Sequence, residues 1–263
     1  MNPGGDAQAG PQRRLPLHQI LVAAFTLPWR HRAAVARVVG LPLLAVIAST
    51  LFFNLGLPNS GAARWTLYLL YLLATSWLAL SVHRLVLLES GDARARLDAD
   101  GLGRLGRFVA ALVVIWLVYA AIMLLVQLAA LFTLAPSIPA GQRPAAVASF
   151  PAWVQWTASI LAIWPAARLC LVLPAAAVDR SFDPRIAWRL SRGNGWRLAV
   201  IIGVLPWALK WLAHLFYRQG ATLVEFGVLL VLVASFTVFQ VVALSLAYWE
   251  LTQPAPPPTD PLA

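Results

Sequence analysis

The chain has 263 residues, of which 60% are hydrophobic and 11% are charged, and its mean hydropathy is +0.75. Soluble domains are about half apolar and a quarter charged, so this composition excludes an ordinary soluble protein and indicates a membrane protein. The net charge is +10, but the basic clusters are short and accompany no recognition module, so we expect no nucleic-acid partner. The single cysteine, Cys170, excludes an intrachain disulfide.

Both ends of the chain are predicted to be disordered tails. Residues 1–14 are rich in Gly, Pro and polar side chains, and residues 251–263 are rich in Pro. The residues between them, 15–250, form the predicted membrane domain. The first long apolar segment begins only near Val38 and no convincing small-residue cleavage site follows it, so we expect a retained span and not a secretory signal.

A short amphipathic helix is predicted to begin at Leu17. Apolar residues recur there with helical spacing, and the pattern stops at Pro28, before a group of arginines. Such a helix suits the headgroup layer of a membrane. Packing against the cytoplasmic ends of the other helices explains the same pattern equally well.

Six apolar runs follow, and each has about the 20 residues that a helix needs to cross roughly 30 Å of hydrocarbon. Several of them begin or end in Trp or Tyr, as expected for rings at the membrane interface. The runs are Val38–Leu57, Trp65–Leu88, Phe108–Ala135, Trp153–Ala177, Leu198–Tyr217 and Phe226–Trp249.

The basic residues indicate the orientation of these spans. Loops that stay in the cytoplasm carry an excess of Lys and Arg. The N-terminal segment, the second loop and the fourth loop carry five arginines each, whereas the opposite loops hold Arg64, Arg143 and Arg218. Lys210 lies near the same end of its own run, and Arg168 lies within a run. We therefore expect a multi-pass protein of the bacterial inner membrane with both termini in the cytoplasm. The arginines on the cytoplasmic side are Arg13, Arg14, Arg30, Arg32 and Arg37, then Arg84, Arg94, Arg96, Arg104 and Arg107, then Arg180, Arg185, Arg189, Arg192 and Arg197.

The fourth loop is predicted to contain a short basic helix. Asp183 followed by Pro184 is typical of a helix start, and the Gly-Asn-Gly turn centred on Asn194 is typical of a helix stop. Arg185, Arg189 and Arg192 fall on one side of this helix at the membrane surface. These arginines could fix topology alone, bind anionic lipid headgroups or contact a protein partner. The predicted fold class is thus all-α: a polytopic six-helix transmembrane bundle with an N-terminal amphipathic helix and a basic interfacial helix.

Arg168 falls near the cytoplasmic end of the fourth run, where a charge is costly unless it reaches the headgroups or a partner. We favour an arginine whose guanidinium extends to the headgroups, as also for Arg84 in the second run, over a buried ion pair, for example with Asp179. Pro165 and Pro174 flank Arg168 and predict a bend in this helix.

Two further features of the runs concern packing. Ala158, Ala162 and Ala166 recur every four residues, which predicts a close helix–helix contact. His83, next to Arg84, is predicted to be an interfacial residue and not a ligand.

The residues R168xxLxLP174AxA and W188RLSxG193N194xW196R197 resemble a motif of uncharacterised bacterial six-helix inner-membrane proteins. That family is similar to the membrane domain attached to some glycerophosphodiester phosphodiesterases. The resemblance implies an α-helical membrane domain with a role in envelope or lipid handling. Because the soluble phosphodiesterase barrel is missing, it implies no phosphodiesterase activity. The predicted lipid- or partner-binding residues are Arg168, Arg185, Arg189, Arg192, Asn194, Trp196 and Arg197.

The sequence offers no candidate for catalysis, for a metal or for a cofactor. Gly101, Gly103 and Gly106 spell GxGxxG, but they are predicted to lie in a loop with no βαβ unit around them. Carboxylates are almost absent from the runs, so acid–base chemistry within the membrane lacks its residues. We predict a non-enzymatic domain that binds lipid or a membrane-protein partner. The alternative is a small transporter or permease component, for which the runs supply few polar residues: Asn54, Gln127, Gln155 and Gln240.

Overall fold

The computed structural model describes residues 14–54, 61–88, 99–134, 152–180, 183–206, 208 and 223–253. All regular secondary structure within these ranges is helical. This agrees with the all-α prediction, because chains that cross a membrane must satisfy their backbone hydrogen bonds internally. The predicted tails lie outside the described residues except for Arg14 and residues 251–253.

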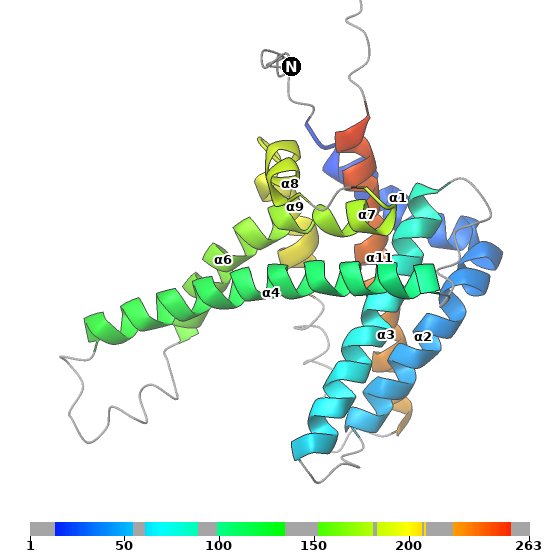
Figure 1. The fold of residues 1–263 in the computed structure, drawn as a ribbon, viewed down its shortest axis with the longest axis horizontal. Helices are drawn as coiled ribbons and strands as arrows, with labels where there is room; N and C mark the ends of the chain where they lie inside the picture. Colours follow the sequence, from blue (N-terminus) through cyan, green and yellow to red (C-terminus); the bar gives the residue numbers. More distant parts are fainter. Residues whose placement is uncertain are drawn as a thin grey trace, which may run out of the picture.

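Ten helical elements make up the described part of the chain (Figure 1). They are α1 (Leu17–Arg30), α2 (Arg32–Asn54), α3 (Gly61–Leu87), α4 (Ala99–Leu134), α6 (Ala152–Leu169), α7 (Val172–Ala177), α8 (Pro184–Leu190), α9 (Gly195–Ala199), the π-helix η4 (Val200–Val204) and α11 (Leu223–Thr252).

Five segments of these helices are long and apolar enough to cross a membrane. They match five of the six predicted runs, and the bounds are Arg32–Phe52, Gly61–Leu87, Asp100–Thr133, Trp153–Ala177 and Gly227–Thr252. The remaining run, Leu198–Tyr217, is described only in part, and the structure has there a shorter apolar helix over Gly195–Val204. The rest of that run lies outside the described residues.

The long helices form two groups and not the single bundle that was predicted (Figure 1). In the first group α3 packs against α2 and α11, and in the second α4 packs against α6. The α4–α6 pair runs across the first group in this view. Helix α4 contacts α3 directly, and the short helix α7 contacts α4 as well as α3 and α11. Ala158 and Ala162 of α6 are buried, so small side chains lie inside the structure as their spacing predicted.

The helix that carries Arg168 is interrupted near the second of its two flanking prolines. Helix α6 ends at Leu169 and α7 begins at Val172. Pro174 has no backbone N–H for the carbonyl of Cys170, and Leu173 donates to that carbonyl instead over 3.0 Å. Pro165, by contrast, lies inside the continuous helix α6. The break therefore falls where the second proline removes a hydrogen bond.

Two predicted local structures were wrong. Helix α1 continues through Pro28 to Arg30, which is possible because the missing N–H of a proline removes only one bond of the helix. The glycines of the GxGxxG sequence lie in the first turns of α4 and not in a loop. Helix α11 ends at Thr252, within two residues of the end predicted for the membrane domain.

His83 lies in the core of the described residues. Its side chain is buried between α3, α4 and α11, where its Nδ1 lies 2.7 Å from Ser245 Oγ and its ring lies 5.7 Å from that of Phe108. The Ser245 hydroxyl also lies 2.8 Å from the Val241 carbonyl of its own helix. His83 thus joins the two helix groups.

Candidate functional site

Helix α8 is built by the residues that predicted it. Asp183 caps its start, because a carboxylate oxygen of Asp183 accepts a hydrogen bond of 2.8 Å from the Arg185 amide, and Pro184 follows. Helix α8 ends at Leu190, so Arg192 lies in the turn that follows and not on the helix. Gly193 then adopts a positive φ of 74°, which glycine allows without a steric cost.

Arg168 is buried beneath α8 and does not extend to the headgroups. Its Nε donates to Ser191 Oγ over 2.8 Å, and its Nη2 donates to the Trp188 carbonyl over 2.7 Å. The guanidinium also stacks on the Trp188 ring, 3.7 Å from the ring centre. Carbonyls at a helix C-terminus lack partners within the helix, and Arg168 satisfies one of them. Both predicted roles for Arg168, the headgroup anchor and the ion pair with Asp179, were therefore wrong.

Asn194 connects the end of this loop to the start of the described chain. The buried Oδ1 of Asn194 accepts hydrogen bonds from the Leu15 amide over 2.9 Å and from Arg197 Nη1 over 3.0 Å. Gly195 follows it because a Cβ there would lie 2.9 Å from Trp164 Nε1. The Gly-Asn-Gly turn therefore does more than end a helix, because it binds Asn194 to Leu15, which lies 179 positions earlier in the sequence.

A second arginine cluster surrounds Asp179, in the turn after α7. Asp179 has a φ of 58°, and the Arg180 amide closes the turn on the Ala175 carbonyl over 3.0 Å. The Asp179 carboxylate pairs with Arg107 at 2.7 Å, Arg104 at 3.0 Å and Arg84 at 3.7 Å. We call Arg84, Arg104, Arg107 and Asp179 the Asp179 cluster. It joins α3, α4 and α7 through one carboxylate.

Arg84 has the same kind of role as Arg168. Its side chain is buried, and its Nη1 donates to the Ala177 carbonyl over 3.0 Å, at the C-terminus of α7. The predicted headgroup anchor at Arg84 was therefore also wrong. Each of these arginines supplies a positive charge and a donor at a helix C-terminus, where both are stabilising.

Four arginines of the fourth loop contrast with those described above. Within the described part of the chain their guanidinium groups are exposed and make no hydrogen bond or ion pair: Arg180, Arg185, Arg189 and Arg192. Exposed apolar rings lie beside them, since Trp188 is 37% and Trp196 is 55% exposed. We call the four arginines with Trp188 and Trp196 the basic surface. Mixed guanidinium and indole groups are typical of a membrane–water interface.

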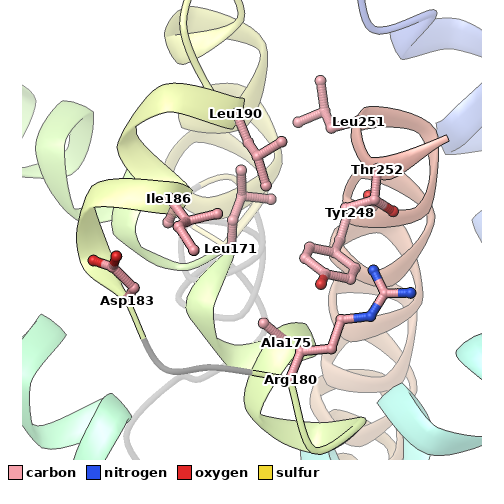
Figure 2. Close-up of a pocket in the computed structure, with 10 residues that line it drawn as sticks. Leu171, Ala175, Arg180, Asp183, Ile186, Leu190, Tyr248, Leu251 and Thr252 are labelled. Carbon is pink, nitrogen blue, oxygen red and sulfur yellow. The ribbon is translucent and has the colours of Figure 1, made fainter. Parts of the chain in front are cut away.

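A cavity of about 310 Å³ opens beside the basic surface, between α7, α8 and the last turns of α11 (Figure 2). Its walls are mainly apolar, and Arg180 is the only basic residue among those that line it. Figure 2 shows the Arg180 guanidinium beside Tyr248 and Thr252, whereas the Asp183 carboxylate points away from the cavity. The lining residues are Leu171, Ala175, Arg180, Asp183, Ile186, Ala187, Leu190, Tyr248, Leu251 and Thr252.

The seven predicted site residues are therefore divided between two roles. Arg168, Asn194 and Arg197 bind other parts of the protein, while Arg185, Arg189, Arg192 and Trp196 are exposed or at its surface. Sequence reasoning missed Arg180 as a cavity residue and missed the Asp179 cluster. One signal was present for the cluster: Asp179 is the first carboxylate after Asp100, so few negative charges were available to pair with the arginines at this end.

In the described ranges, no group of three or more His, Cys, Asp or Glu side chains is placed to hold a metal ion. Comparisons of the chain with protein-family models, with curated proteins and with solved structures found no match. The resemblance of residues 168–197 to the family of inner-membrane proteins therefore stays a prediction. What is shown is an all-helical protein whose several long apolar helices indicate a membrane protein.

Proposed function

We propose that this chain is a six-span protein of the bacterial inner membrane that binds anionic lipid headgroups through the basic surface and catalyses no reaction. The observation that carries this proposal is the set of four exposed guanidinium groups without a protein partner in the described ranges. Five other arginines of the same end, Arg84, Arg104, Arg107, Arg168 and Arg197, are all engaged by protein atoms. The free groups thus remain for an external anion, such as a phosphate oxygen.

The course of the chain supports a sixth span. Helix α11 runs from the end where α2 stops and α3 starts toward the end where α1 and α8 lie (Figure 1). The chain leaves the vicinity of α8 at Gly195 and enters α11 at Leu223. A span over the predicted run Leu198–Tyr217 would join these two ends of the molecule.

The same arrangement supports cytoplasmic termini. Helix α1 packs against α11, and the end of α11 lies near α1 and α8 (Figure 1). Both described ends of the chain therefore share a side with the basic surface and with the Asp179 cluster. Clusters of arginine mark the cytoplasmic side of a membrane protein.

Helix α1 has an outward face that suits the headgroup layer. Ile20 and Ala24 are buried against the protein, whereas Phe25 is 65% and Trp29 is 71% exposed. Val22, one turn before Phe25, is exposed as well. A helix with one face on the protein and an apolar face outward can lie along the membrane surface, so both predicted roles for α1 are compatible with its packing.

The lipids that copurify in native nanodiscs test this proposal. We expect the wild type to carry more anionic phospholipid than a variant with Arg185, Arg189 and Arg192 all changed to Ala. The same three positions changed to Lys form the matched control, because the charge is kept. Equal anionic lipid in the wild type and the alanine variant would overturn headgroup binding and leave topology alone or a protein partner as the role of these arginines.

A further inference from the structure

We infer that the cavity between α7, α8 and α11 is a binding site for one anionic phospholipid, with its phosphate on Arg180 and an acyl chain between α8 and α11. This inference rests on the proposed function, and it names the site at which the protein binds an anionic lipid most tightly. The cavity lies at the end of the molecule that carries the basic surface (Figures 1 and 2). A lipid in the cytoplasmic leaflet would present its phosphate at that level.

Arg180 supplies the group that recognises the phosphate. Its backbone is fixed, because its amide closes the turn on the Ala175 carbonyl over 3.0 Å. Its guanidinium lies at the cavity beside Tyr248 and Thr252 (Figure 2) and has no hydrogen-bond or ion-pair partner in the described residues. A guanidinium in that state offers several donors to phosphate oxygens.

The one carboxylate at the cavity does not compete for Arg180. Asp183 caps α8 through the Arg185 amide at 2.8 Å, and its carboxylate points away from the cavity in Figure 2. The other carboxylate near Arg180 in sequence, Asp179, is held by the arginines of its cluster. The charge facing the cavity is therefore positive, which suits an anionic and not a cationic ligand.

The walls of the cavity select an apolar chain. Leu171, Ile186 and Leu190 come from one side and Leu251 from the other (Figure 2). The volume of about 310 Å³ lies at the lower end of the range for ligand pockets, roughly 300–1,000 Å³. A small hydrophilic anion would leave these apolar walls in contact with water, whereas the first part of an acyl chain would cover them. A phospholipid meets both demands of the site.

Titration of the delipidated full-length protein with phosphatidylglycerol, followed by native mass spectrometry, tests the inference. Phosphatidylcholine with the same chains is the reference lipid. We expect one phosphatidylglycerol to bind before all others, and we expect Arg180→Gln to weaken that first binding by about tenfold, the loss of a charge-assisted hydrogen bond. Arg180→Lys keeps the charge and should retain most of the affinity.

Ile186→Trp tests the apolar part of the site separately, because it fills the cavity from its rim and leaves every arginine in place. We expect it to weaken the same first binding, with an unchanged melting temperature as evidence that the protein is folded. If Arg180→Gln and Ile186→Trp both leave the first binding intact while the Arg185, Arg189 and Arg192 alanine variant loses anionic lipid, the cavity is not the site and the proposed function stands. If none of these variants changes phosphatidylglycerol binding, both proposals are wrong.

Discussion

Arg107 on α4 donates a hydrogen bond of 2.7 Å to the carboxylate of Asp179, 72 residues later in the chain. The same carboxylate pairs with Arg104 and with the nearly buried Arg84. One negative charge thus fixes the turn after α7 against both helix groups. This contact holds together the end of the protein from which the basic surface projects.

The first prediction concerns Asp179. Asp179→Asn keeps the shape and tolerates the positive φ of 58°, but it removes the charge that faces three arginines. Exposed ion pairs contribute up to about 1 kcal/mol each and partly buried ones more, so we expect a loss of about 1–2 kcal/mol and a lower melting temperature. Asp100→Asn, at an exposed residue of the first turn of α4, is the control. Equal melting temperatures for the two variants would contradict the role given to Asp179.

The second prediction concerns Arg168. Arg168→Lys keeps the charge but cannot donate to Ser191 and Trp188 together while stacking on the Trp188 ring. We expect a loss of about 2 kcal/mol in thermal or chemical denaturation, the effect of a lost charge-assisted hydrogen bond in a buried site. The same change at the exposed Arg189 should cost less than about 0.5 kcal/mol. If Arg168→Lys is as stable as Arg189→Lys, Arg168 is not the cap of α8.

The third prediction concerns the link between Asn194 and Leu15. Asn194→Ala removes the oxygen that accepts from the Leu15 amide, so we expect faster hydrogen–deuterium exchange in the peptide that contains Leu15. Asn194→Asp keeps an acceptor and should keep that amide protected. Unchanged exchange in the alanine variant would mean that the amide is protected by other contacts.

The fourth prediction concerns the two helix groups. The α4–α6 pair runs across the first group in the view of Figure 1, whereas transmembrane helices tilt by roughly 0–40° from the bilayer normal. We expect spin labels at Trp65→Cys on α3 and Phe132→Cys on α4, with Cys170→Ala, to be closer in nanodiscs than in the structure. A pair within the first group, Phe52→Cys on α2 with Trp65→Cys, should match the structure. A Trp65–Phe132 distance as long as in the structure would contradict this rearrangement.

The sequence predicted the features that depend on local chemistry. Helical apolar runs, the Asp183–Pro184 start of α8 and the interruption near Pro174 all follow from residues close together in the chain. The six-span count goes beyond this, because the described residues contain five candidate spans. That count remains part of the proposal.

Predictions that needed distant partners failed. Arg84 and Arg168 looked like headgroup anchors because only their depth within a run could be read. The carbonyls of Ala177 and Trp188, which satisfy them, lie 93 and 20 residues away. Asn194 similarly meets Leu15 from the other end of the chain. Burial and pairing of polar groups depend on the tertiary fold, so a pattern along the chain could locate these residues without assigning their roles.

The central claim is that the basic surface binds anionic headgroups, and photo-crosslinking in nanodiscs tests it most directly. Phosphatidylglycerol and phosphatidylcholine with the same diazirine near the carbonyl end of the acyl chain would be compared, and the labelled peptides identified by mass spectrometry. For residues 183–197 we expect labelling by phosphatidylglycerol to exceed labelling by phosphatidylcholine. This ratio should be several-fold higher than the ratio at the apolar surface of α4, around Leu124 and Leu125. That preference should disappear when Arg185, Arg189 and Arg192 are changed to Gln. Equal labelling of residues 183–197 by the two lipids in the wild type would contradict the claim.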